Sequence, residues 1–417
     1  MTYTVQRPGR MQARVLLPSS KSLSNRALLL SALCSPQADI LRTSDCDDTR
    51  VMLQALENRS EVVDILAAGT AMRFLTAYFA STPGEDHVLT GTQRMRERPI
   101  SVLVDALRTL GADIEYVENE GFPPLHISGR KLDGGELTLK ANVSSQYVSA
   151  LLMVAPTMDK GLVLHLDGDI ISRPYIDMTL YLMRDFGAEA EWTTDQSIQV
   201  RPGGYSRSEA FTVESDWSAA SYWYEMVALS PDAEARVELP HLYAQSLQGD
   251  SAVHTYFLPL GVKTEFVLEP DGISTVVLTK DEAHKMLAGR VLELDLVDQP
   301  DLAQTLVVTC AMLHRPFRFT GLKSLRIKET DRVAALQAEL LKFGISLEAT
   351  DDGELHIFHY PDHAPAWDGR AVCTYHDHRM AMSFAPAALV TGAFEMEHPE
   401  VVSKSYPHFW EDLKCLY

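Results

Sequence analysis

Residues 102–116 read VLVDALRTLGADIEY, and this stretch decides the fold. Its first nine residues space their apolar side chains as a helix does, and Gly111 follows where a helix needs a residue of positive φ. The alternating residues of 111–116 and 125–129 then predict two half-buried strands. The stretch therefore predicts a helix that packs on a pair of strands.

The same unit recurs along the chain. Three further copies lie at 180–200 with Gly187, at 253–278 with Gly261, and at 334–357 with Gly344. Two more positions are irregular: residues 51–64 start a helix but hold neither a glycine nor a strand pair, and a last helix is expected at about 406–416. Six units indicate two domains of three. The alternative is that this order is common in α+β sequences and recurs by coincidence.

The N-terminal residues suggest how the last unit is completed. Segments 3–6 and 12–17 look like two strands that pair around Pro8-Gly9. We expect them to complete the last unit, which would place both chain ends in one domain.

Composition limits the function. A chain of 417 residues is too long for one ordinary core, so two domains are expected. A net charge of −20 argues against nucleic acid or an anionic membrane as partner. No apolar run approaches the roughly 20 residues of a membrane span, and no secretion signal is evident, so a cytoplasmic location is expected. The five cysteines form no Cys-x-x-Cys pair, which predicts reduced and mostly buried thiols.

Within this acidic chain, seven cationic residues occur in short motifs rich in Ser, Thr and Gly. They are Lys21, Arg26, Arg94, Lys328, Arg332, Arg379 and Lys404. If the fold brings these segments together, they form a cationic cleft that attracts small, multiply charged substrates. Phosphate and carboxylate are the natural ligands of such groups. The pattern favours an enzyme acting on small anions.

Several of these motifs begin helices. In segment 17–30, serines precede an apolar helical run, and Ser22 and Arg26 are expected on one helix face. Backbone N–H groups beside Lys21 would then form an anion site, although the glycines of a Walker loop are absent. Gly69-Thr70 enters a second helix in the same way. Plain helix capping explains either segment equally well.

Other segments supply hydroxyl, amide and guanidinium groups. Residues 94–99 hold three arginines before Pro99, while 144–147 and 172–175 carry groups suited to a polyol or a phosphate. Solvated basic or polar turns are the alternative for each.

Two segments carry candidates for acid–base chemistry. Gln299-Pro-Asp301 and Arg326-Ile-Lys-Glu-Thr-Asp-Arg332 place carboxylates among cations, which can tune a group for proton transfer. An ordinary ion-paired helix start is the alternative. In segment 375–380, His376 and His378 could bind a metal on a strand, but no further ligands stand at metal-binding spacing. A capped helix start that directs His378 and Arg379 into a cleft is favoured, and no metal is expected.

Six motifs in this order closely resemble the family of 5-enolpyruvylshikimate-3-phosphate (EPSP) synthase, or 3-phosphoshikimate 1-carboxyvinyltransferase, over essentially the whole chain. The motifs lie at 21–26, 68–73, 96–99, 144–146, 328–332 and 377–382. No single motif would suffice, but six in register are highly specific.

The resemblance implies an α/β (α+β) fold of two domains. Each domain is an inside-out α/β barrel of three βαβαββ-type units around a pseudo-threefold axis, with the first unit truncated here. Residues 20–213 would form the shikimate 3-phosphate side, and residues 1–19 with 214–417 the second domain. The active site would lie in the cleft between the domains, which closes on substrate by hinges near 18–19 and 213–214.

The resemblance also implies the reaction. The 5-hydroxyl of shikimate 3-phosphate attacks C2 of phosphoenolpyruvate while C3 is protonated, and the resulting tetrahedral ketal loses phosphate and a methyl proton. Asp301 would take the hydroxyl proton, Glu329 would first be protonated and would serve C3, and Lys21 would assist the departing phosphate. The shikimate pathway leads through this step to chorismate and the aromatic amino acids.

Substrate contacts carry over from the family residue by residue. For shikimate 3-phosphate they are Lys21, Ser22, Arg26, Ser144, Ser145, Gln146, Ser172, Tyr175, Asp301, Ser324 and Lys328. For phosphoenolpyruvate they are Lys21, Gly69, Thr70, Arg94, Gln146, Arg332, His378, Arg379 and Lys404. The resemblance implies no cofactor, no metal and a monomer. Because Gly69 is retained, it also implies inhibition by glyphosate.

The chain departs from the family pattern at a few positions. Ala67 and Ser324 stand where asparagine is usual, Phe74 replaces a frequent proline, and Ser19 replaces a frequent glycine. Loss of an amide at position 67 would remove a hydrogen bond worth about 1–3 kcal/mol if nothing replaces it. Phe74 could weaken glyphosate binding by shifting its helix.

Two other functions compete with this interpretation. The sister transferase acting on UDP-N-acetylglucosamine shares the fold but uses a cysteine on a mobile loop, and residues 84–99 contain none. A non-catalytic anion-binding protein is the second alternative, but Lys21, Asp301 and Glu329 are all present.

Overall fold

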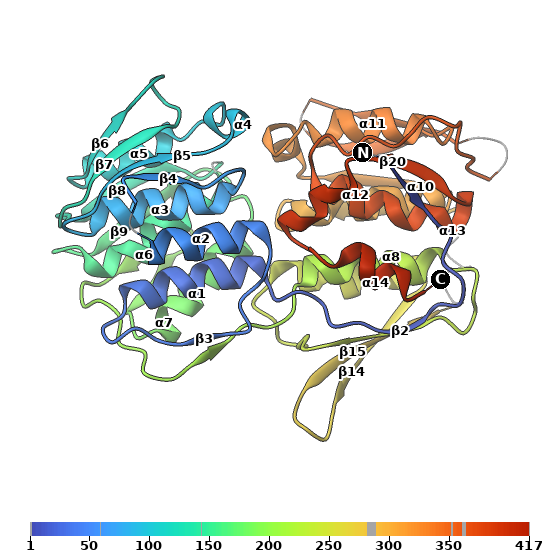
Figure 1. The fold of residues 1–417 in the computed structure, drawn as a ribbon, viewed down its shortest axis with the longest axis horizontal. Coiled ribbons are helices and arrows are strands. Elements are labelled where there is room, and N and C mark those ends of the chain that lie inside the picture. Colours follow the sequence, from blue (N-terminus) through green and yellow to red (C-terminus); the bar gives the residue numbers. More distant parts are fainter. Residues whose placement is uncertain are drawn as a thin grey trace. The chain divides into compact units, whose positions relative to one another are not determined.

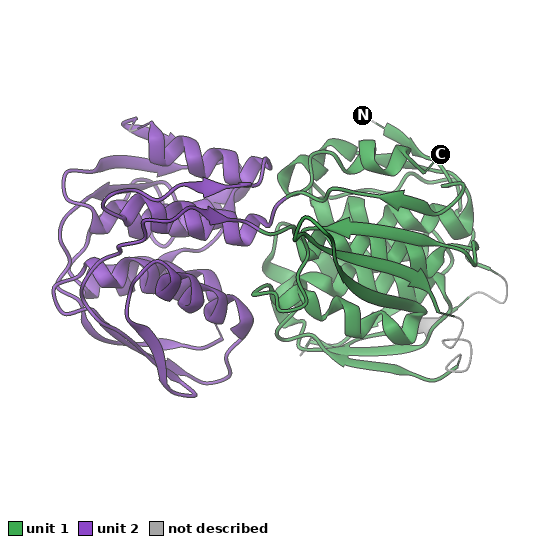
Figure 2. Ribbon diagram, turned by 90° about the horizontal axis from the view of Figure 1, so that it is seen from below, with its two compact units in different colours: residues 1–18, 214–417 green, residues 19–213 purple. Residues whose placement is uncertain are grey.

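The computed structural model describes residues 2–58, 60–142, 144–281, 289–351, 353–360 and 364–416. The chain divides into two compact units, which Figure 2 shows in green and purple. Unit 1 comprises Met1–Pro18 and Glu214–Tyr417, and unit 2 comprises Ser19–Val213. Both ends of the chain therefore belong to unit 1.

Unit 2 alternates helices with short strands (Figure 1). Its helices are α1 (Lys21–Leu33), α2 (Asp47–Glu57), α3 (Gly69–Ser81), α4 (Gln93–Arg96), α5 (Ser101–Thr109), α6 (Ser145–Val154) and α7 (Arg173–Asp185). Its strands are β3 (Ile40–Leu41), β4 (Val62–Asp64), β5 (Asp86–Thr90), β6 (Asp113–Tyr116), β7 (Leu125–Ser128), β8 (Gly135–Lys140), β9 (Leu162–Asp167), β10 (Ala190–Thr194), β11 (Ser197–Val200) and β12 (Phe211–Thr212).

Two four-stranded sheets of unit 2 share one topology. In the order β4-β5-β7-β6, the first pair is parallel and the other two are antiparallel. The order β10-β11-β9-β8 repeats this pattern, with β8 parallel to β9. A parallel pair needs a crossover, and α3 and α6 supply it. The short pair β3 and β12 joins the two ends of the unit.

Unit 1 uses the same kinds of element. Its helices are α8 (Trp217–Leu229), α9 (Val253–Tyr256), α10 (Ala303–Met312), α11 (Arg332–Leu341), α12 (His378–Phe384), α13 (Ala388–Thr391) and α14 (Phe409–Lys414). Its strands are β1 (Thr2–Val5), β2 (Gln12–Arg14), β13 (Arg236–Pro240), β14 (Val262–Leu268), β15 (Ser274–Lys280), β16 (Leu292–Asp295), β17 (Phe317–Thr320), β18 (Ser346–Ala349), β19 (Leu355–His359) and β20 (Phe394–Glu397).

The two four-stranded sheets of unit 1 follow the same rule. Their orders are β14-β15-β13-β2 and β16-β17-β19-β18, each with one parallel pair, β2 with β13 and β16 with β17. The described residues thus contain four sheets of one topology, which agrees with the four sequence copies. The mixed α/β class is confirmed, whereas the barrel around a threefold axis stays a prediction.

The predicted glycines end their helices as expected. Gly111, Gly187, Gly261 and Gly344 have φ values of 102°, 95°, 92° and 79°, in the left-handed region that glycine adopts without steric cost. The third copy differs, because residues 253–260 are the short helix α9 followed by a 3-10 turn, Leu258–Leu260. The last helix, α14, is also shorter than the expected 406–416.

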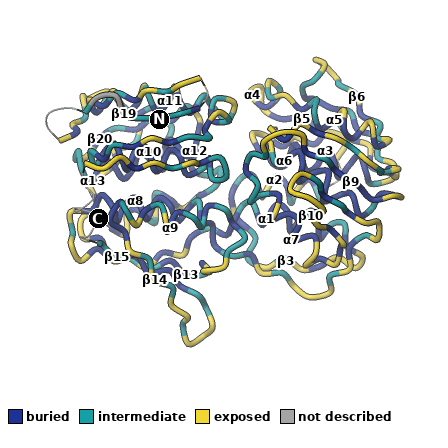
Figure 3. Tube along the Cα trace, turned by 180° about the vertical axis from the view of Figure 1, so that it is seen from behind, coloured by how far each residue is buried: buried dark blue, intermediate teal, exposed yellow. Residues whose placement is uncertain are grey.

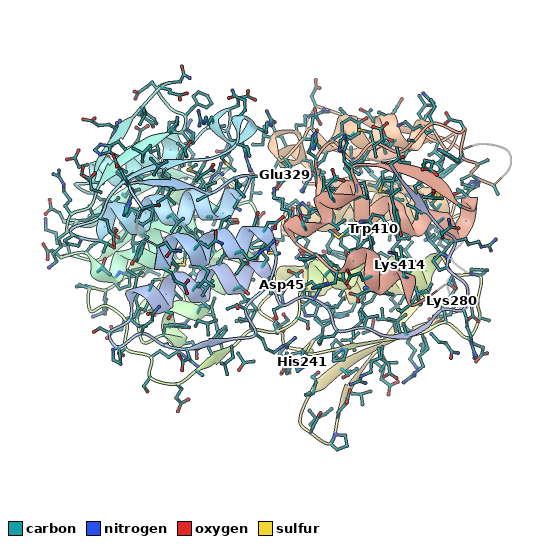
Figure 4. The ribbon with its side chains drawn as sticks, viewed as in Figure 1. Asp45, His241, Lys280, Glu329, Trp410 and Lys414 are labelled. Atoms are coloured by element: carbon teal, nitrogen blue, oxygen red, sulfur yellow. The ribbon has the colours of Figure 1, made fainter. Side chains whose placement is uncertain are left out.

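The expected pairing of the N-terminal strands was wrong. β1 pairs with β20, antiparallel, and β2 pairs with β13, parallel, so the two strands belong to different sheets. Pro8-Gly9 connects them without forming a hairpin. The pairing of β1 with β20 nevertheless ties the N-terminal strand to the last unit, as predicted. Tyr3 also packs on Trp410 of α14, with ring centroids 4.7 Å apart (Trp410 is labelled in Figure 4).

Helices at the centre of each unit are buried on every side. All residues of α3 in unit 2 and of α10 in unit 1 are buried, and Figure 3 shows these helices in dark blue. Such helices carry small and apolar residues all round, because no face meets water. Their N-terminal ends hold the polar groups described below.

The cysteines are all free thiols, and Cys34, Cys46 and Cys310 are buried. No helix in the described part of the chain has both the length and the apolar character to cross a membrane.

Candidate active site

Arg332 is the centre of a charged cluster in unit 1. It is the first residue of α11, which starts here because the Asp331 carboxylate accepts hydrogen bonds from the N–H groups of Val333 and Ala334, both at 3.1 Å. This N-cap satisfies two of the N–H groups that a helix start leaves unpaired. The guanidinium of Arg332 is thereby directed into the unit, where it is buried.

The Arg332 guanidinium contacts three carboxylates. It donates to Asp377 Oδ2 at 2.7 Å, to Asp301 Oδ1 at 3.1 Å and to Glu329 Oε2 at 2.9 Å. Burial alone would lower the pKa of Arg332, but Asp377, Glu329 and Asp301 raise it above its ordinary value. Arg332 therefore remains cationic and links the two predicted acid–base residues.

Asp301 lies in the 3-10 turn Pro300–Leu302, just before α10. It accepts from Arg379 at 2.9 Å, and the Lys328 ammonium is 3.6 Å away. Burial raises the pKa of Asp301, but Arg379, Lys328 and Arg332 together outweigh it and hold this pKa well below its usual range. Asp301 is therefore an ionised acceptor at neutral pH.

Glu329 is held between two cations. Its Oε1 accepts from Lys404 Nζ at 2.8 Å, and its Oε2 accepts from Arg332 (Glu329 is labelled in Figure 4). Lys404 ends the 3-10 segment Pro399–Lys404, so two separate stretches of unit 1, 329–332 and 399–404, meet at this carboxylate. Charge-assisted bonds to both oxygens favour the carboxylate form in this structure.

The start of α12 completes the cluster. Asp377 caps this helix by accepting from the Arg379 N–H at 2.9 Å, as the capped-helix interpretation of segment 375–380 expected. His378 is buried beside it, with Nδ1 3.8 Å from Asp377 Oδ1. The structure thus brings together six predicted residues of unit 1 in one network: Asp301, Lys328, Glu329, Arg332, Arg379 and Lys404.

Sequence reasoning missed the carboxylates behind this network. Asp377 lies in the motif 377–382, but the sequence indicated no role for it. Asp250 is buried, accepts from the Ser218 hydroxyl, and its pKa is raised to about 6 by burial and by Asp301. Ser218 in turn lies 3.5 Å from the Arg379 guanidinium. The segment Gln248-Gly249-Asp250 gave no signal among 57 acidic residues.

Ser324 is the predicted residue of unit 1 that stays apart. It lies in the 3-10 segment Lys323–Ile327, and its hydroxyl is buried without a hydrogen-bond partner in the described part of the chain.

In unit 2, α1 begins at Lys21 with Ser20 as its N-cap. The Lys21 ammonium lies 3.2 Å from the carboxylate of Asp48, which is buried at the start of α2. Asp48 was not predicted. One turn further on, Arg26 donates to the carbonyl of Ser22 at 3.0 Å.

Arg26 is enclosed by α1, α6 and α7. It donates to the hydroxyls of Thr179 at 2.7 Å and Ser149 at 3.2 Å, and to the carbonyl of Tyr175 at 3.4 Å. Its guanidinium carbon lies 5.3 Å from the ring centroid of Phe74 and 5.8 Å from that of Tyr175. Burial lowers the pKa of Arg26 to about 10, so it stays cationic at neutral pH. Arg26 thus links three helices, in addition to its predicted role in the shikimate 3-phosphate site.

Gly69 and Thr70 open α3, as the sequence indicated. The Thr70 hydroxyl accepts from Gln146 Nε2 at 3.1 Å, which joins two predicted residues. A Cβ on Gly69 would lie 2.8 Å from Arg98 Nη1 and 3.2 Å from Arg73 Nη1, so two guanidinium groups crowd this helix start. Arg94 is exposed instead and lies 3.7 Å from Glu97.

The predicted hydroxyl groups lie at two other helix starts. Ser144 caps α6 by accepting from the Gln146 N–H at 3.3 Å, with Ser145 as the first helical residue. Ser172 precedes α7 with φ 57°, and Tyr175 is in the first turn. The free N–H groups at a helix start point along the helix axis toward its N-terminal end, which suits an anion.

Among the described residues, no group of three or more His, Cys, Asp or Glu side chains is arranged to hold a metal ion. His376 lies against His398, with ring centroids 4.9 Å apart, and not against further ligands.

Fold and site define a class: an α/β enzyme of two units with a network of carboxylates and cations. Comparison with known proteins identifies the family within this class. The chain matches the family described as EPSP synthase (3-phosphoshikimate 1-carboxyvinyltransferase) over residues 5–60 and 56–413. It therefore belongs to the EPSP synthase family.

Relatives and solved structures agree. The chain is 54% identical over 427 residues to the 3-phosphoshikimate 1-carboxyvinyltransferase of Bacteroides fragilis, covering 99% of this chain and 97% of that protein. It is 35% identical over 443 residues to the enzyme of that name from Photobacterium profundum, covering 99% and 98%. In fold, it is similar to the EPSP synthase of Acinetobacter baumannii, with a TM-score of 0.76, 21% identity, and coverage of 100% and 98%.

Proposed function

We propose that this chain is a 3-phosphoshikimate 1-carboxyvinyltransferase of the shikimate pathway. It transfers the 1-carboxyvinyl group of phosphoenolpyruvate to the 5-hydroxyl of shikimate 3-phosphate and releases phosphate. Family membership supports the reaction. In the structure, the observation that best supports this function is the pair of carboxylates, Asp301 and Glu329, which the buried Arg332 bridges.

The arrangement suits two proton transfers. Asp301 accepts the proton of the 5-hydroxyl as its oxygen attacks C2, and Glu329 supplies a proton to C3. The ketal then expels phosphate, with Lys21 assisting, and the new methyl group returns a proton to the Glu329 carboxylate. Each carboxylate is in contact with cations in this structure, so substrate binding must change their surroundings first.

Phosphoenolpyruvate can make this change itself. Its carboxylate and phosphate compete for the N–H groups of Arg332, Arg379 and Lys404, which Asp301 and Glu329 now occupy. When these cations turn to the substrate, Asp301 becomes a stronger base and Glu329 can take up a proton. Binding of the anion thus prepares both carboxylates.

Residues of unit 2 are proposed to hold both substrates. Ser22, Arg26, Ser144, Ser145, Gln146, Ser172 and Tyr175 serve shikimate 3-phosphate, and Lys21, Gly69, Thr70 and Arg94 serve phosphoenolpyruvate. Arg26 also fixes the backbone of Ser22 and Tyr175 through its hydrogen bonds. In unit 1, Ser324 and Lys328 are proposed for shikimate 3-phosphate and His378 for phosphoenolpyruvate. A role for the cleft and its hinges stays a prediction, as do the monomeric state, the cytoplasmic location and inhibition by glyphosate.

The relatives' names favour this reaction over transfer to UDP-N-acetylglucosamine. The absence of cysteine from residues 84–99 points the same way.

Phosphate release from shikimate 3-phosphate plus phosphoenolpyruvate, without added metal, tests the proposal. We expect turnover by the unmodified protein and a loss of at least about a hundredfold in Glu329→Gln, because general acid–base groups contribute about 10²–10⁴ in rate. Glu348→Gln is the matched control, since this carboxylate is half exposed and bonds to His356. Turnover with UDP-N-acetylglucosamine instead would contradict the proposed acceptor. Binding without turnover would favour the non-catalytic alternative.

A further inference from the structure

The segment that carries Asp377 and Arg379 enters the site through an unusual turn. Tyr375 and His376 have φ values of 53° and 55°, so two successive residues other than glycine adopt the left-handed conformation. Side chains with a Cβ adopt this region at a cost in free energy, and such a turn persists only where its surroundings hold it. Something must therefore fix residues 373–376.

A buried carboxylate on α11 makes the required contacts. Glu339 is fully buried, and its Oε1 accepts from the Tyr375 hydroxyl at 2.8 Å. Its Oε2 accepts from the backbone N–H of Cys373 at 2.9 Å and lies 2.7 Å from Lys342 Nζ. Lys342 also donates to the carbonyl of Ala371 at 2.7 Å, so α11 grips the start of the segment with two side chains.

The same helix, α11, also contacts the end of the segment. Arg332 lies seven residues before Glu339, about two helical turns, which places both on one face of α11. Arg332 bonds to Asp377 at 2.7 Å, and Asp377 caps the helix that carries Arg379. Between these two sets of contacts, the Asp377 N–H donates to the carbonyl of Thr374 at 2.8 Å. One helix face therefore holds both ends of the left-handed turn.

We propose that Glu339 is a positioning residue for phosphoenolpyruvate binding, acting through Tyr375 and Cys373 on the placement of Asp377 and Arg379. The inference rests on the proposed function of the site. Without the Glu339 contacts, residues 375 and 376 can relax to ordinary backbone conformations. Asp377 then moves relative to Arg332, and Arg379 moves away from Asp301.

Tyr375→Phe is the primary test, because it removes only the hydroxyl that bonds to Glu339 and keeps the aromatic ring. We expect the KM for phosphoenolpyruvate to rise about three- to tenfold, while the KM for shikimate 3-phosphate changes less than twofold. Tyr224→Phe is the matched control: it also removes a tyrosine hydroxyl of unit 1, paired with Thr264 at 2.9 Å, on a helix that does not carry the segment. Both KM values should stay unchanged in the control.

Two substitutions of Glu339 separate positioning from general stability. In Glu339→Gln, the amide oxygen can accept from Cys373 and the amide nitrogen can donate to the hydroxyl oxygen of Tyr375, so the KM for phosphoenolpyruvate should stay within about threefold. In Glu339→Leu both contacts are lost, and the same KM should rise more than tenfold. If the leucine variant does not fold, Tyr375→Phe still decides the outcome.

A purely structural role would lower the folded fraction and the apparent kcat without changing either KM. That result in Tyr375→Phe, with urea unfolding as the measure of the folded fraction, would overturn the inference. A protein that releases no phosphate in its unmodified form would contradict the proposed function instead, so the two failures are distinguishable.

Discussion

At the scale of the residue, chemistry in this protein depends on how a few cations are shared among carboxylates. Arg332 bonds to three carboxylates at once, and Lys404 and Arg379 each serve one of the two predicted acid–base groups. In the low dielectric of a buried site these charges act strongly on one another. An incoming anion therefore competes directly with the protein's own carboxylates for the same N–H groups.

Gly69, at the start of α3, allows a test of the proposed phosphoenolpyruvate site in unit 2. In Gly69→Ala the new Cβ would stand 2.8 Å from Arg98 Nη1 and 3.2 Å from Arg73 Nη1, so both guanidinium ends must shift. We expect about a tenfold rise in the KM for phosphoenolpyruvate and weaker inhibition by glyphosate, with little change for shikimate 3-phosphate. Steady-state kinetics check this. An equal rise in the KM values for both substrates would contradict the assignment of Gly69 to the phosphoenolpyruvate site.

Glu214, the first residue of unit 1 after unit 2, predicts a pH dependence of stability. Burial raises its pKa from 4.5 to about 7, although bonds from Gln248 and Ser246 oppose the shift. The folded protein therefore keeps a proton that the unfolded chain releases, so this residue's contribution is complete below about pH 4.5 and is lost as the pH rises through 7. The loss is on the order of 3 kcal/mol.

Glu214→Gln tests this assignment, because its amide oxygen can accept from both Ser246 and Gln248 while the side chain no longer titrates. Urea denaturation gives the free energy of unfolding between pH 5 and pH 8. This free energy should fall less steeply with pH in the variant than in the unmodified protein. Parallel curves would assign the dependence to other groups.

At the scale of the element, local sequence predicts helix ends well and strand partners poorly. Gly111 and Gly344 could be recognised as helix ends because the left-handed conformation is a local requirement. The pairing of β1 with β20 depends on residues almost 400 positions apart, which no local pattern records. Asp48 and Asp250 were missed for a related reason: a carboxylate becomes functional through its neighbours in space, and the acidic composition conceals it.

The packing of α8 on α10 leads to a prediction at the scale of the element. Glu225 of α8 is fully buried, and neither of its oxygens makes a hydrogen bond of normal geometry in the described part of the chain. Burial raises its pKa well above the ordinary value, although the nearby Thr309 side chain opposes this shift. Burying a carboxyl group without partners costs about 1–3 kcal/mol. Glu225→Met keeps the length of the side chain and removes this cost.

We therefore expect Glu225→Met to raise the free energy of unfolding by about 1–3 kcal/mol at pH 7. The gain should grow with pH above 4.5, since the unfolded chain of the unmodified protein ionises there while the folded one does not. Chemical denaturation at several pH values measures both effects. A less stable variant would show that Glu225 has a compensating partner.

At the scale of the whole molecule, the connectivity makes the two units unequal. Unit 2 is one continuous stretch, 19–213, whose terminal strands β3 and β12 pair with each other. Unit 1 needs both ends of the chain, because β1 completes the sheet with β20 and β2 completes the sheet with β13. The sequence predicted two domains from six units, two of them irregular, and it also predicted that both chain ends lie in one domain. Which strands receive β1 and β2 follows only from the observed pairing.

We expect the fragment 19–213 to fold alone, with a cooperative unfolding transition, and to bind shikimate 3-phosphate without releasing phosphate. The fragment 214–417 lacks β1 and β2, so β13 and β20 expose unpaired edges, and it should aggregate or stay partly unfolded. Adding residues 1–18 to its N-terminus through a flexible linker is the matched control and should restore solubility. Circular dichroism in urea, sedimentation and calorimetric titration measure these properties. A cooperative, monomeric 214–417 fragment would show that the N-terminal strands are dispensable, and an unfolded 19–213 fragment would show that unit 2 depends on unit 1.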